Sequence, residues 1–94
     1  MAKDRRIVGA RITGRVQGVG FRAWTHGEAE RHGLAGWVRN EPDGSVAVLL
    51  AGSGPAVSAM IDLLWEGPPG AAVSGVETRE EAPDDLPADF RVTG

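Results

Sequence analysis

The residues best suited to chemistry form a glycine-rich stretch near the start of the chain, residues 14–22, which reads GRVQGVGFR. It follows an alternating apolar segment and precedes apolar residues at helical spacing, so it predicts a loop that leads into a helix. The N–H groups of such a loop can converge, and a helix N-terminus adds unpaired donors and a partial positive charge. The stretch therefore predicts a cradle for an anion such as a phosphoryl group.

Arg22 stands in the first turn of the expected helix. Its guanidinium could fold back over the cradle, where its paired donors match two phosphate oxygens. Loop and arginine together could bind a phosphoryl group without a metal ion. The alternative is structural: Gly18 and Gly20 only form the turn, and Arg22 lies in solvent.

Other motifs for chemistry are weaker or absent. Residues 18–23 also fit the G-x-G-x-x-A pattern of dinucleotide-binding folds, but a turn at residues 42–44 makes the next strands antiparallel, and 94 residues are too few for a doubly wound sheet. The sequence has no Gly-Lys-Ser/Thr of a P-loop and no G-x-S-x-G elbow. His26 and His32 stand six apart rather than at the i, i+4 spacing of a metal pair, and the acidic residues 77–89 lack the spacing of a calcium loop. We therefore expect no metal site and no cofactor.

Composition limits the class of protein. The chain has 94 residues and no cysteine, so we expect one domain over residues 1–94, with no disulfide and no thiolate site. A net charge of -3 disfavours general binding to a phosphate backbone. No apolar run approaches the roughly 20 residues of a membrane span, and the start lacks the apolar core of a secretory signal. We therefore expect a cytoplasmic protein.

The charges are unevenly distributed along the chain. Residues 1–40 carry eight basic and three acidic residues, whereas the rest of the chain has a net charge of -8. Nine of the ten basic residues are arginine, which favours forked recognition of carboxylate or phosphate. The pattern indicates either an anion site in the first half or a solvated surface on which the signs happen to segregate.

The elements that must position the loop follow from apolar periodicity and turn residues. We expect strands at residues 7–14, 34–40, 45–51 and 72–79, and helices at residues 21–32 and from residue 54 to the GPPG stretch at 67–70. Residues 41–44 (EPDG) predict a tight turn, so the second and third strands should form an antiparallel hairpin. The spacing of Val73 and Val76 indicates a bulge near Gly75, and Phe90 and Val92 alternate as in a short fifth strand or a docked tail.

This order of elements predicts an α+β, ferredoxin-like βαββαβ fold, with a four-stranded antiparallel sheet and two helices on one face. Trp24, Trp37 and Trp65 are interpreted as core or half-buried packing residues.

Two segments resemble the motif blocks of the acylphosphatase family: residues 14–22, and residues 33–40 with 42–46. Residues 67–76 and 90–92 also look like that family, so the resemblance spans nearly the whole chain. It implies a ferredoxin-like fold and hydrolysis of the carboxyl–phosphate anhydride of acyl phosphates, giving a carboxylate and inorganic phosphate without a metal. The enzyme is then expected to be a small monomer without a cofactor.

The resemblance also implies roles for single residues, by their positions in the matched blocks. Arg22 would be the phosphate-binding arginine and Asn40 the residue that positions the attacking water. The amide cradle would be formed by Gln17, Gly18, Val19, Gly20, Phe21 and Arg22. From residue type alone, Asn40 is also explained as a hairpin-entry residue that caps its own backbone.

Two other classes of function compete with the enzyme. A phosphate- or carbamoyl-phosphate-binding module of the same fold, as found at the front of larger carbamoyl-transferring maturation proteins, would use the cradle without hydrolysis; the short chain favours the stand-alone enzyme. An RNA-binding sheet needs aromatic side chains on its central strands, but the chain has no tyrosine, and Phe21 and Phe90 lie outside those strands. We therefore expect an acyl phosphate as ligand, with no nucleic acid or membrane partner. Nothing in the sequence selects the acyl group, the protein partners or the role of the acidic stretch.

Overall fold

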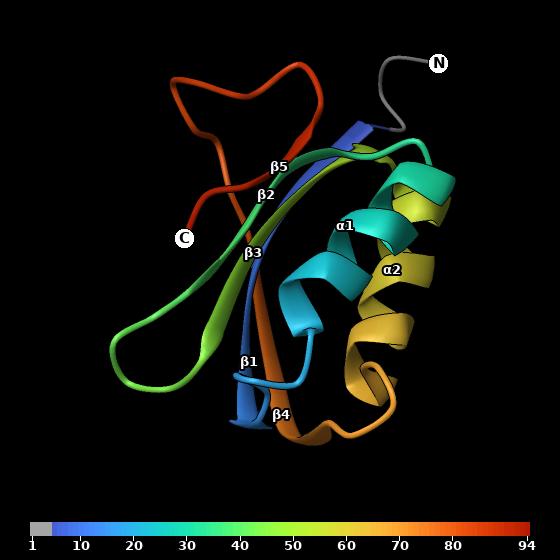
Figure 1. The fold of residues 1–94 in the computed structure, drawn as a ribbon. Coiled ribbons are helices and arrows are strands. Elements are labelled where there is room, and N and C mark those ends of the chain that lie inside the picture. Colours follow the sequence, from blue (N-terminus) through green and yellow to red (C-terminus); the bar gives the residue numbers. More distant parts are fainter. Residues whose placement is uncertain (1–4) are drawn as a thin grey trace.

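The computed structural model describes residues 5–94, so residues 1–4 lie outside the described part. The elements follow the predicted order (Figure 1): β1 (Arg5–Arg15), α1 (Phe21–Arg31), β2 (Ala35–Asn40), β3 (Val46–Ser53), α2 (Gly54–Glu66), β4 (Ala72–Glu80) and β5 (Phe90–Val92). Both helices cover the same face of the sheet, and the other face is open. The α+β class and the placement of both helices are therefore confirmed.

The prediction of four antiparallel strands is wrong in one respect, because the sheet has five strands in the order β4-β1-β3-β2-β5. Strand β5 pairs in parallel with β2, with Gly36 opposite Phe90 and Val38 opposite Val92. The physical reason is that β2 would otherwise be an edge strand with unpaired backbone groups. Pairing there also buries Phe90, which is 3% exposed. The sheet is therefore mixed.

The core lies between the sheet and the helices and follows the two expected periodicities. Along β1 the buried residues Val8, Ala10 and Ile12 alternate with exposed or half-buried neighbours. In helix α2 the spacing i, i+3, i+4, i+7 of Val57, Met60, Ile61 and Leu64 forms one apolar stripe, of which Val57, Met60 and Leu64 are buried and Ile61 is partly buried. Helix α1 buries Phe21, Thr25 and Ala29, one per helical turn. The apolar face of α1 begins at its first residue, so burial of Phe21 fixes where the preceding loop enters the helix.

The boundaries of the elements agree with their capping and turn residues. Ser53 caps α2, because its hydroxyl accepts a hydrogen bond from the Ala56 N–H at 3.2 Å. Helix α1 ends at Arg31, one residue earlier than predicted, before Gly33 with φ of 68°. The register of β1 with β4 shifts so that Ser74 has no partner, which confirms a bulge beside Gly75.

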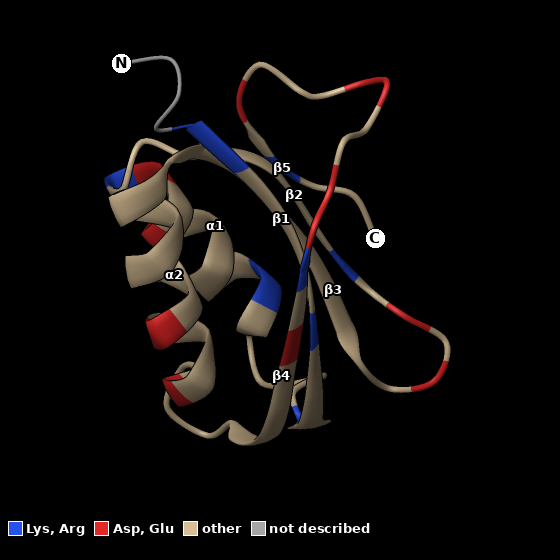
Figure 2. Ribbon diagram, turned by 180° about the vertical axis from the view of Figure 1, so that it is seen from behind, with Lys and Arg blue, Asp and Glu red and all other residues tan. Residues whose placement is uncertain are grey.

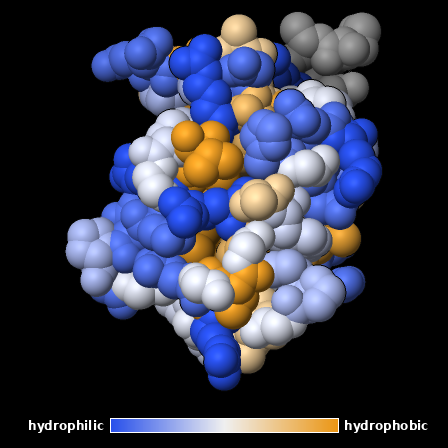
Figure 3. Space-filling view, in the orientation of Figure 1, coloured by the Kyte–Doolittle hydropathy of each residue, from blue (hydrophilic) through white to orange (hydrophobic). Residues whose placement is uncertain are grey.

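Of the three tryptophans, Trp24 and Trp37 are half-buried as interpreted, whereas Trp65 is 51% exposed, so its interpretation as a packing residue is wrong. It stands on the solvent side of α2, as the last residue but one of that helix. On the face seen in Figure 3, hydrophobic residues form separate patches among hydrophilic ones. No helix within residues 5–94 is long and apolar enough to span a membrane.

The segregation of charge along the sequence is only partly visible in space (Figure 2). Acidic residues lie on the segment that joins β4 to β5 and near the turn between β2 and β3, but also on both helices and on β4, whereas basic residues lie on β1, β2 and the start of α1. The acidic segment is therefore separated from the loop that leads into α1.

Candidate active site

The loop between β1 and α1, residues 16–20, has the conformation that an anion cradle requires. Gly18 and Gly20 have φ of 76° and 79°, in the left-handed region that glycine adopts without strain. Gly20 is the N-cap of α1, and it provides no side chain to accept from the first-turn N–H groups. Those N–H groups have no partner within the helix, so the positive end of α1 is left uncapped.

A cavity of about 310 Å³ opens in front of this helix end. It is lined by Val16, Gly18, Gly20, Phe21, Arg22, Ala23, Asn40 and Val92. Five of the predicted site residues therefore meet in one concavity: Gly18, Gly20, Phe21, Arg22 and Asn40. Within residues 5–94, the cavity wall includes no carboxylate and no imidazole.

The two remaining predicted cradle residues, Gln17 and Val19, do not line the cavity. Val19 is half-buried and packs against the hydrophobic core, where it anchors the middle of the loop. The Gln17 side chain points instead toward the turn between β2 and β3, where its Nε2 donates to the carbonyl oxygens of Glu41 and Ser45, each at 2.8 Å.

Arg22 and Asn40 are connected through the last residue of the chain. The Arg22 Nη1 donates to the main-chain oxygen of Gly94. The Asn40 backbone N–H donates to the same oxygen at 3.2 Å. Arg22 is half-buried and lines the cavity, and its bond to Gly94 directs the guanidinium toward the strand end that carries Asn40.

Asn40 is the last residue of β2 and is paired with Val46 of β3. The turn that follows is capped by another residue, Asp43, whose carboxylate accepts from the Ser45 hydroxyl at 2.6 Å and the Ser45 N–H at 3.0 Å. Arg11 on β1 also donates to Asp43, at 2.6 Å. The hydrogen bonds from Ser45, with a smaller contribution from Arg11, lower the pKa of the Asp43 carboxyl from its ordinary value. The strand end that carries Asn40 is thus fixed by a turn in which Asp43, not Asn40, is the capping residue.

Three residues of the cavity wall were not predicted: Val16, Ala23 and Val92. Val16 and Ala23 flank the predicted loop and could have been included from their positions. Val92 has no such signal, because it reaches the site only through the pairing of β5 with β2. It is 48% exposed and gives the cavity an apolar margin beside Asn40.

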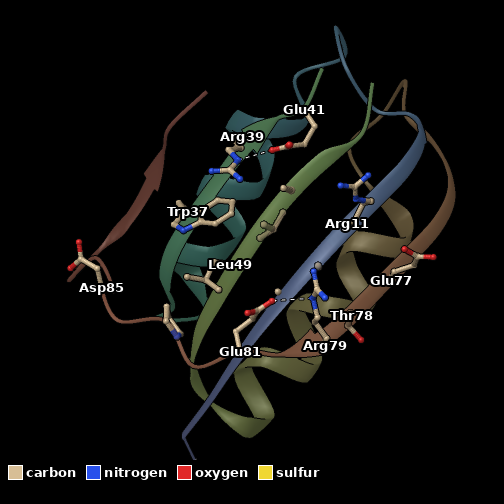
Figure 4. A pocket seen from close by; sticks show the side chains of 15 residues that line it. Arg11, Trp37, Arg39, Glu41, Leu49, Glu77, Thr78, Arg79, Glu81 and Asp85 are labelled. Atoms are coloured by element: carbon tan, nitrogen blue, oxygen red, sulfur yellow. Dashed lines mark hydrogen bonds and ion pairs between the residues drawn. The ribbon is translucent and has the colours of Figure 1, made fainter. Parts of the chain in front are cut away.

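A larger hollow, of about 580 Å³, lies on the open face of the sheet and contains none of the cradle residues. Figure 4 shows Trp37 and Leu49 on its floor, with Arg39 turned toward Glu41 and Arg79 toward Glu81. These two ion pairs measure 2.6 and 3.2 Å, and the Arg39 guanidinium lies 4.5 Å from the centre of the Trp37 ring. Size alone therefore does not mark the active site, because the arginines of this larger hollow are already paired with carboxylates.

Both histidines contact other residues of the same helical segment. His26 lies 3.5 Å from Glu30 on the same helix, and the His32 Nδ1 lies 2.8 Å from the Glu28 carbonyl oxygen. In the described part of the chain, no three His, Cys, Asp or Glu side chains gather where they could hold a metal ion.

Comparison with known proteins shows to which family the chain belongs. The family model described as acylphosphatase matches residues 8–92. The chain belongs to the acylphosphatase family. It is 60% identical over 93 residues to a protein of Rhizobium meliloti (strain 1021) named acylphosphatase, covering 99% of this chain and 98% of that one. The solved structure of an acylphosphatase from Coxiella burnetii superposes with a TM-score of 0.92 at 38% identity, covering 98% of this chain and 96% of that one.

A further structural match is to part of a longer protein. Full-length HypF, crystallised in a phosphate- and nucleotide-bound form, superposes with a TM-score of 0.83 at 26% identity. The match covers 96% of this chain but only 12% of HypF. An acylphosphatase fold therefore also occurs as a small part of a much longer protein.

Proposed function

We propose that this protein hydrolyses the carboxyl–phosphate bond of acyl phosphates, releasing a carboxylate and inorganic phosphate, and that Arg22 and Asn40 carry the reaction. The supporting observation is the single cavity in which the uncapped start of α1, the Arg22 side chain and Asn40 face one another. Relatives that carry the name acylphosphatase at 57–60% identity over nearly the full chain support the same activity.

The phosphoryl group is held by the cradle and Arg22. The first-turn N–H groups and the helix dipole supply fixed partial positive charge, and the guanidinium supplies two parallel donors. In the transition state the negative charge spreads over the equatorial phosphoryl oxygens, where these donors stabilise it without reorganisation.

The leaving group needs no acid from the protein. Breaking the bond between phosphorus and the bridging oxygen releases a carboxylate, whose conjugate acid has a pKa of about 4 to 5 by analogy with side-chain carboxyls. A weak base of this kind departs without prior protonation. This agrees with a cavity wall that, among the described residues, carries no carboxylic acid and no imidazole.

The water is positioned by Asn40, whose side-chain carbonyl accepts one of its hydrogens and directs its oxygen at phosphorus. An amide is not a base at neutral pH, so the proton released on attack passes to a phosphoryl oxygen of the substrate. The new phosphorus–oxygen bond replaces the bond to the carboxylate, and the phosphate leaves with that proton. A titration of kcat between pH 5 and 8 that belongs to a protein carboxylate or histidine would contradict this proton path.

The test of the function is the loss of benzoyl phosphate absorbance on addition of the wild-type protein, with EDTA present to remove trace metals. We expect rapid hydrolysis, with release of equal amounts of benzoate and inorganic phosphate. A folded protein that binds inorganic phosphate but leaves benzoyl phosphate intact would instead support the phosphate- or carbamoyl-phosphate-binding module, which the match to part of HypF favours.

We also infer that the protein acts as a cytoplasmic monomer without a cofactor and has no nucleic acid or membrane partner. The net charge of -3 supports the lack of nucleic-acid binding. The separate apolar patches on the face in Figure 3 support the monomer, because obligate interfaces are large and apolar.

A further inference from the structure

The Gln17 side chain connects the cradle to the hairpin that carries Asn40. It is half-buried, and its Nε2 donates to the carbonyl oxygens of Glu41 and Ser45, both at 2.8 Å. A primary amide nitrogen has two hydrogens, so these two bonds use its whole donor capacity. The opposite orientation of the amide would place its oxygen against two carbonyl oxygens, so the contacts also fix which way the amide faces.

The two acceptors are the carbonyls that define the turn between β2 and β3. The Glu41 N–H donates to the Ser45 oxygen at 2.9 Å, and the Gly44 N–H donates to the Glu41 oxygen at 3.1 Å. Each carbonyl therefore keeps a backbone partner if the Gln17 amide is removed. The turn does not need Gln17 in order to close, which sets this contact apart from an ordinary turn-stabilising bond.

Two of the residues that form these hydrogen bonds are direct neighbours in sequence of residues that line the cavity. Gln17 is joined directly to Gly18 in the cavity wall, and Glu41 is joined directly to Asn40. We propose that Gln17 is a positioning residue, which sets the placement of Asn40, and of the water it holds, relative to the phosphoryl group in the cradle. This inference rests on the proposed function.

The reaction is sensitive to such placement. An attacking atom must lie about 3 to 3.5 Å from its target and in line with the leaving group, and a displacement of about 1 Å can lower the rate about a hundredfold. Apart from Gln17, the cradle and the hairpin are connected by the pairing of β1 with β3, by the bonds of Arg22 and the Asn40 N–H to Gly94, and by the Arg11–Asp43 pair. Among these, only the Gln17 bonds join the loop itself to the turn that follows Asn40, so their loss leaves both halves of the site folded but removes this direct constraint on their relative placement.

The experiment compares Gln17→Met, which keeps the length and half-buried packing of the side chain but removes both donors, with Gln17→Asn, which keeps the donors but shortens their reach. We measure kcat and KM with benzoyl phosphate and the inhibition constant of inorganic phosphate. Both variants should lower kcat about tenfold to a hundredfold, while the inhibition constant of phosphate stays within about threefold of the wild type. Ser53→Ala, which removes the cap of α2, is the control for lost stability.

A double variant separates positioning from a direct contact with substrate. If Gln17 acts through Asn40, adding Gln17→Met to Asn40→Ala should lower kcat by less than about twofold, because the placement of a missing side chain no longer matters. A further full loss in the double variant would overturn the proposal.

Two other results would also overturn the role of Gln17. One is a kcat for Gln17→Met and Gln17→Asn equal to that of the wild type and of Ser53→Ala. The other is a weakening of phosphate inhibition in proportion to the loss of kcat, which would assign Gln17 to phosphate binding itself. A wild-type protein that binds phosphate but hydrolyses no benzoyl phosphate would overturn the proposed function, so the two failures are distinguishable.

Discussion

Arg22 and Asn40 line the same cavity, but alanine at each position is expected to affect different kinetic constants. Arg22→Ala removes charge-assisted hydrogen bonds worth about 1.5–3 kcal/mol, so the inhibition constant of inorganic phosphate should rise at least about tenfold, and hydrolysis should be lost. Asn40→Ala leaves the cradle intact, so phosphate inhibition should remain and kcat should fall about a hundredfold. Steady-state kinetics with benzoyl phosphate, with phosphate as competitor, measures both.

Arg31→Ala is the matched control for this pair of variants, because Arg31 stands in the last turn of α1 and bonds only to Glu28, at 2.8 Å, among the described residues. It should leave kcat and phosphate inhibition unchanged. The roles assigned to Arg22 and Asn40 are wrong if both alanine variants keep a kcat near that of the wild type, or if Asn40→Ala weakens phosphate inhibition as much as Arg22→Ala does.

At the scale of residues, the sequence was most informative where a residue type occurs in few structural settings. Glycines at residues 18 and 20, before an arginine in a first helical turn, predict a cradle, and the φ angles agree. The side chain of Gln17 could not be placed in the same way. A glutamine in a loop has no preferred partner, and its acceptors lie 24 and 28 residues further along the chain.

At the scale of elements, replacing glycine by alanine should have opposite effects on the free energy of unfolding in the loop and in the helix that follows it. Gly18 has φ of 76°, and in the described structure nothing stands within 4 Å of an added Cβ. Gly18→Ala should therefore cost about 1–2 kcal/mol of unfolding free energy through backbone strain rather than through a clash. Gly27 lies inside α1 with equal open space, so Gly27→Ala should stabilise the protein by about 0.5–1 kcal/mol.

Urea unfolding of the two alanine variants measures this difference in sign. Phosphate inhibition should weaken for Gly18→Ala and stay constant for Gly27→Ala, because only the first changes the cradle. Equal stability of the two variants would show that the loop does not hold Gly18 in the left-handed region.

The hairpin that carries Asn40 should lose stability in acid through Asp43. Hydrogen bonds from Ser45 and the nearby Arg11 lower the pKa of Asp43, so folding favours its charged form. The resulting stabilisation is present above the unfolded pKa of about 3.9 and is lost as the pH falls through the folded value. Asp43→Asn should therefore be less stable than the wild type at pH 6, and the difference should shrink below about pH 4.

Urea midpoints measured from pH 2 to pH 7 test this prediction. Asp85→Asn is the control, because Asp85 is exposed and forms no ion pair with another residue of the described range 5–94. If the urea midpoints of Asp43→Asn and the wild type differ by the same amount at all pH values, the charge of Asp43 contributes nothing to the stability of the fold.

The elements themselves were largely predictable, and the exception has a physical cause. The alternation in β1 and the stripe of α2 arise from burial of one face against the core, which leaves its period in the sequence. Strand β5 has only three residues, and its parallel pairing with β2 joins segments more than 50 residues apart. The periodicity of a segment does not indicate which other strand it pairs with, so Val92 could not be assigned to the cavity from sequence.

At the scale of the whole molecule, the site exists only when the complete fold brings its parts together. The cavity takes six residues between Val16 and Ala23 from the first third of the chain, Asn40 from the end of β2, and Val92 from the final strand. Arg22 and the Asn40 N–H meet at Gly94. Binding at this site must therefore stabilise the folded chain relative to the unfolded one, because no local fragment contains all of the contacts.

This linkage gives the last prediction. Inorganic phosphate is a product of the proposed reaction, and at ten times its Kd it should stabilise the native state by about 1.4 kcal/mol. For a domain of this size, that corresponds to a rise in Tm of about 5–10 °C. Thermal unfolding with EDTA measures it, against sodium chloride at equal ionic strength. The rise should be largely lost in Arg22→Ala and persist in Asn40→Ala and Gln17→Met, because of these three side chains only that of Arg22 is expected to contact phosphate. Equal rises in all four proteins, or an equal rise with chloride, would mean that phosphate acts as a general salt and that the cavity does not bind it.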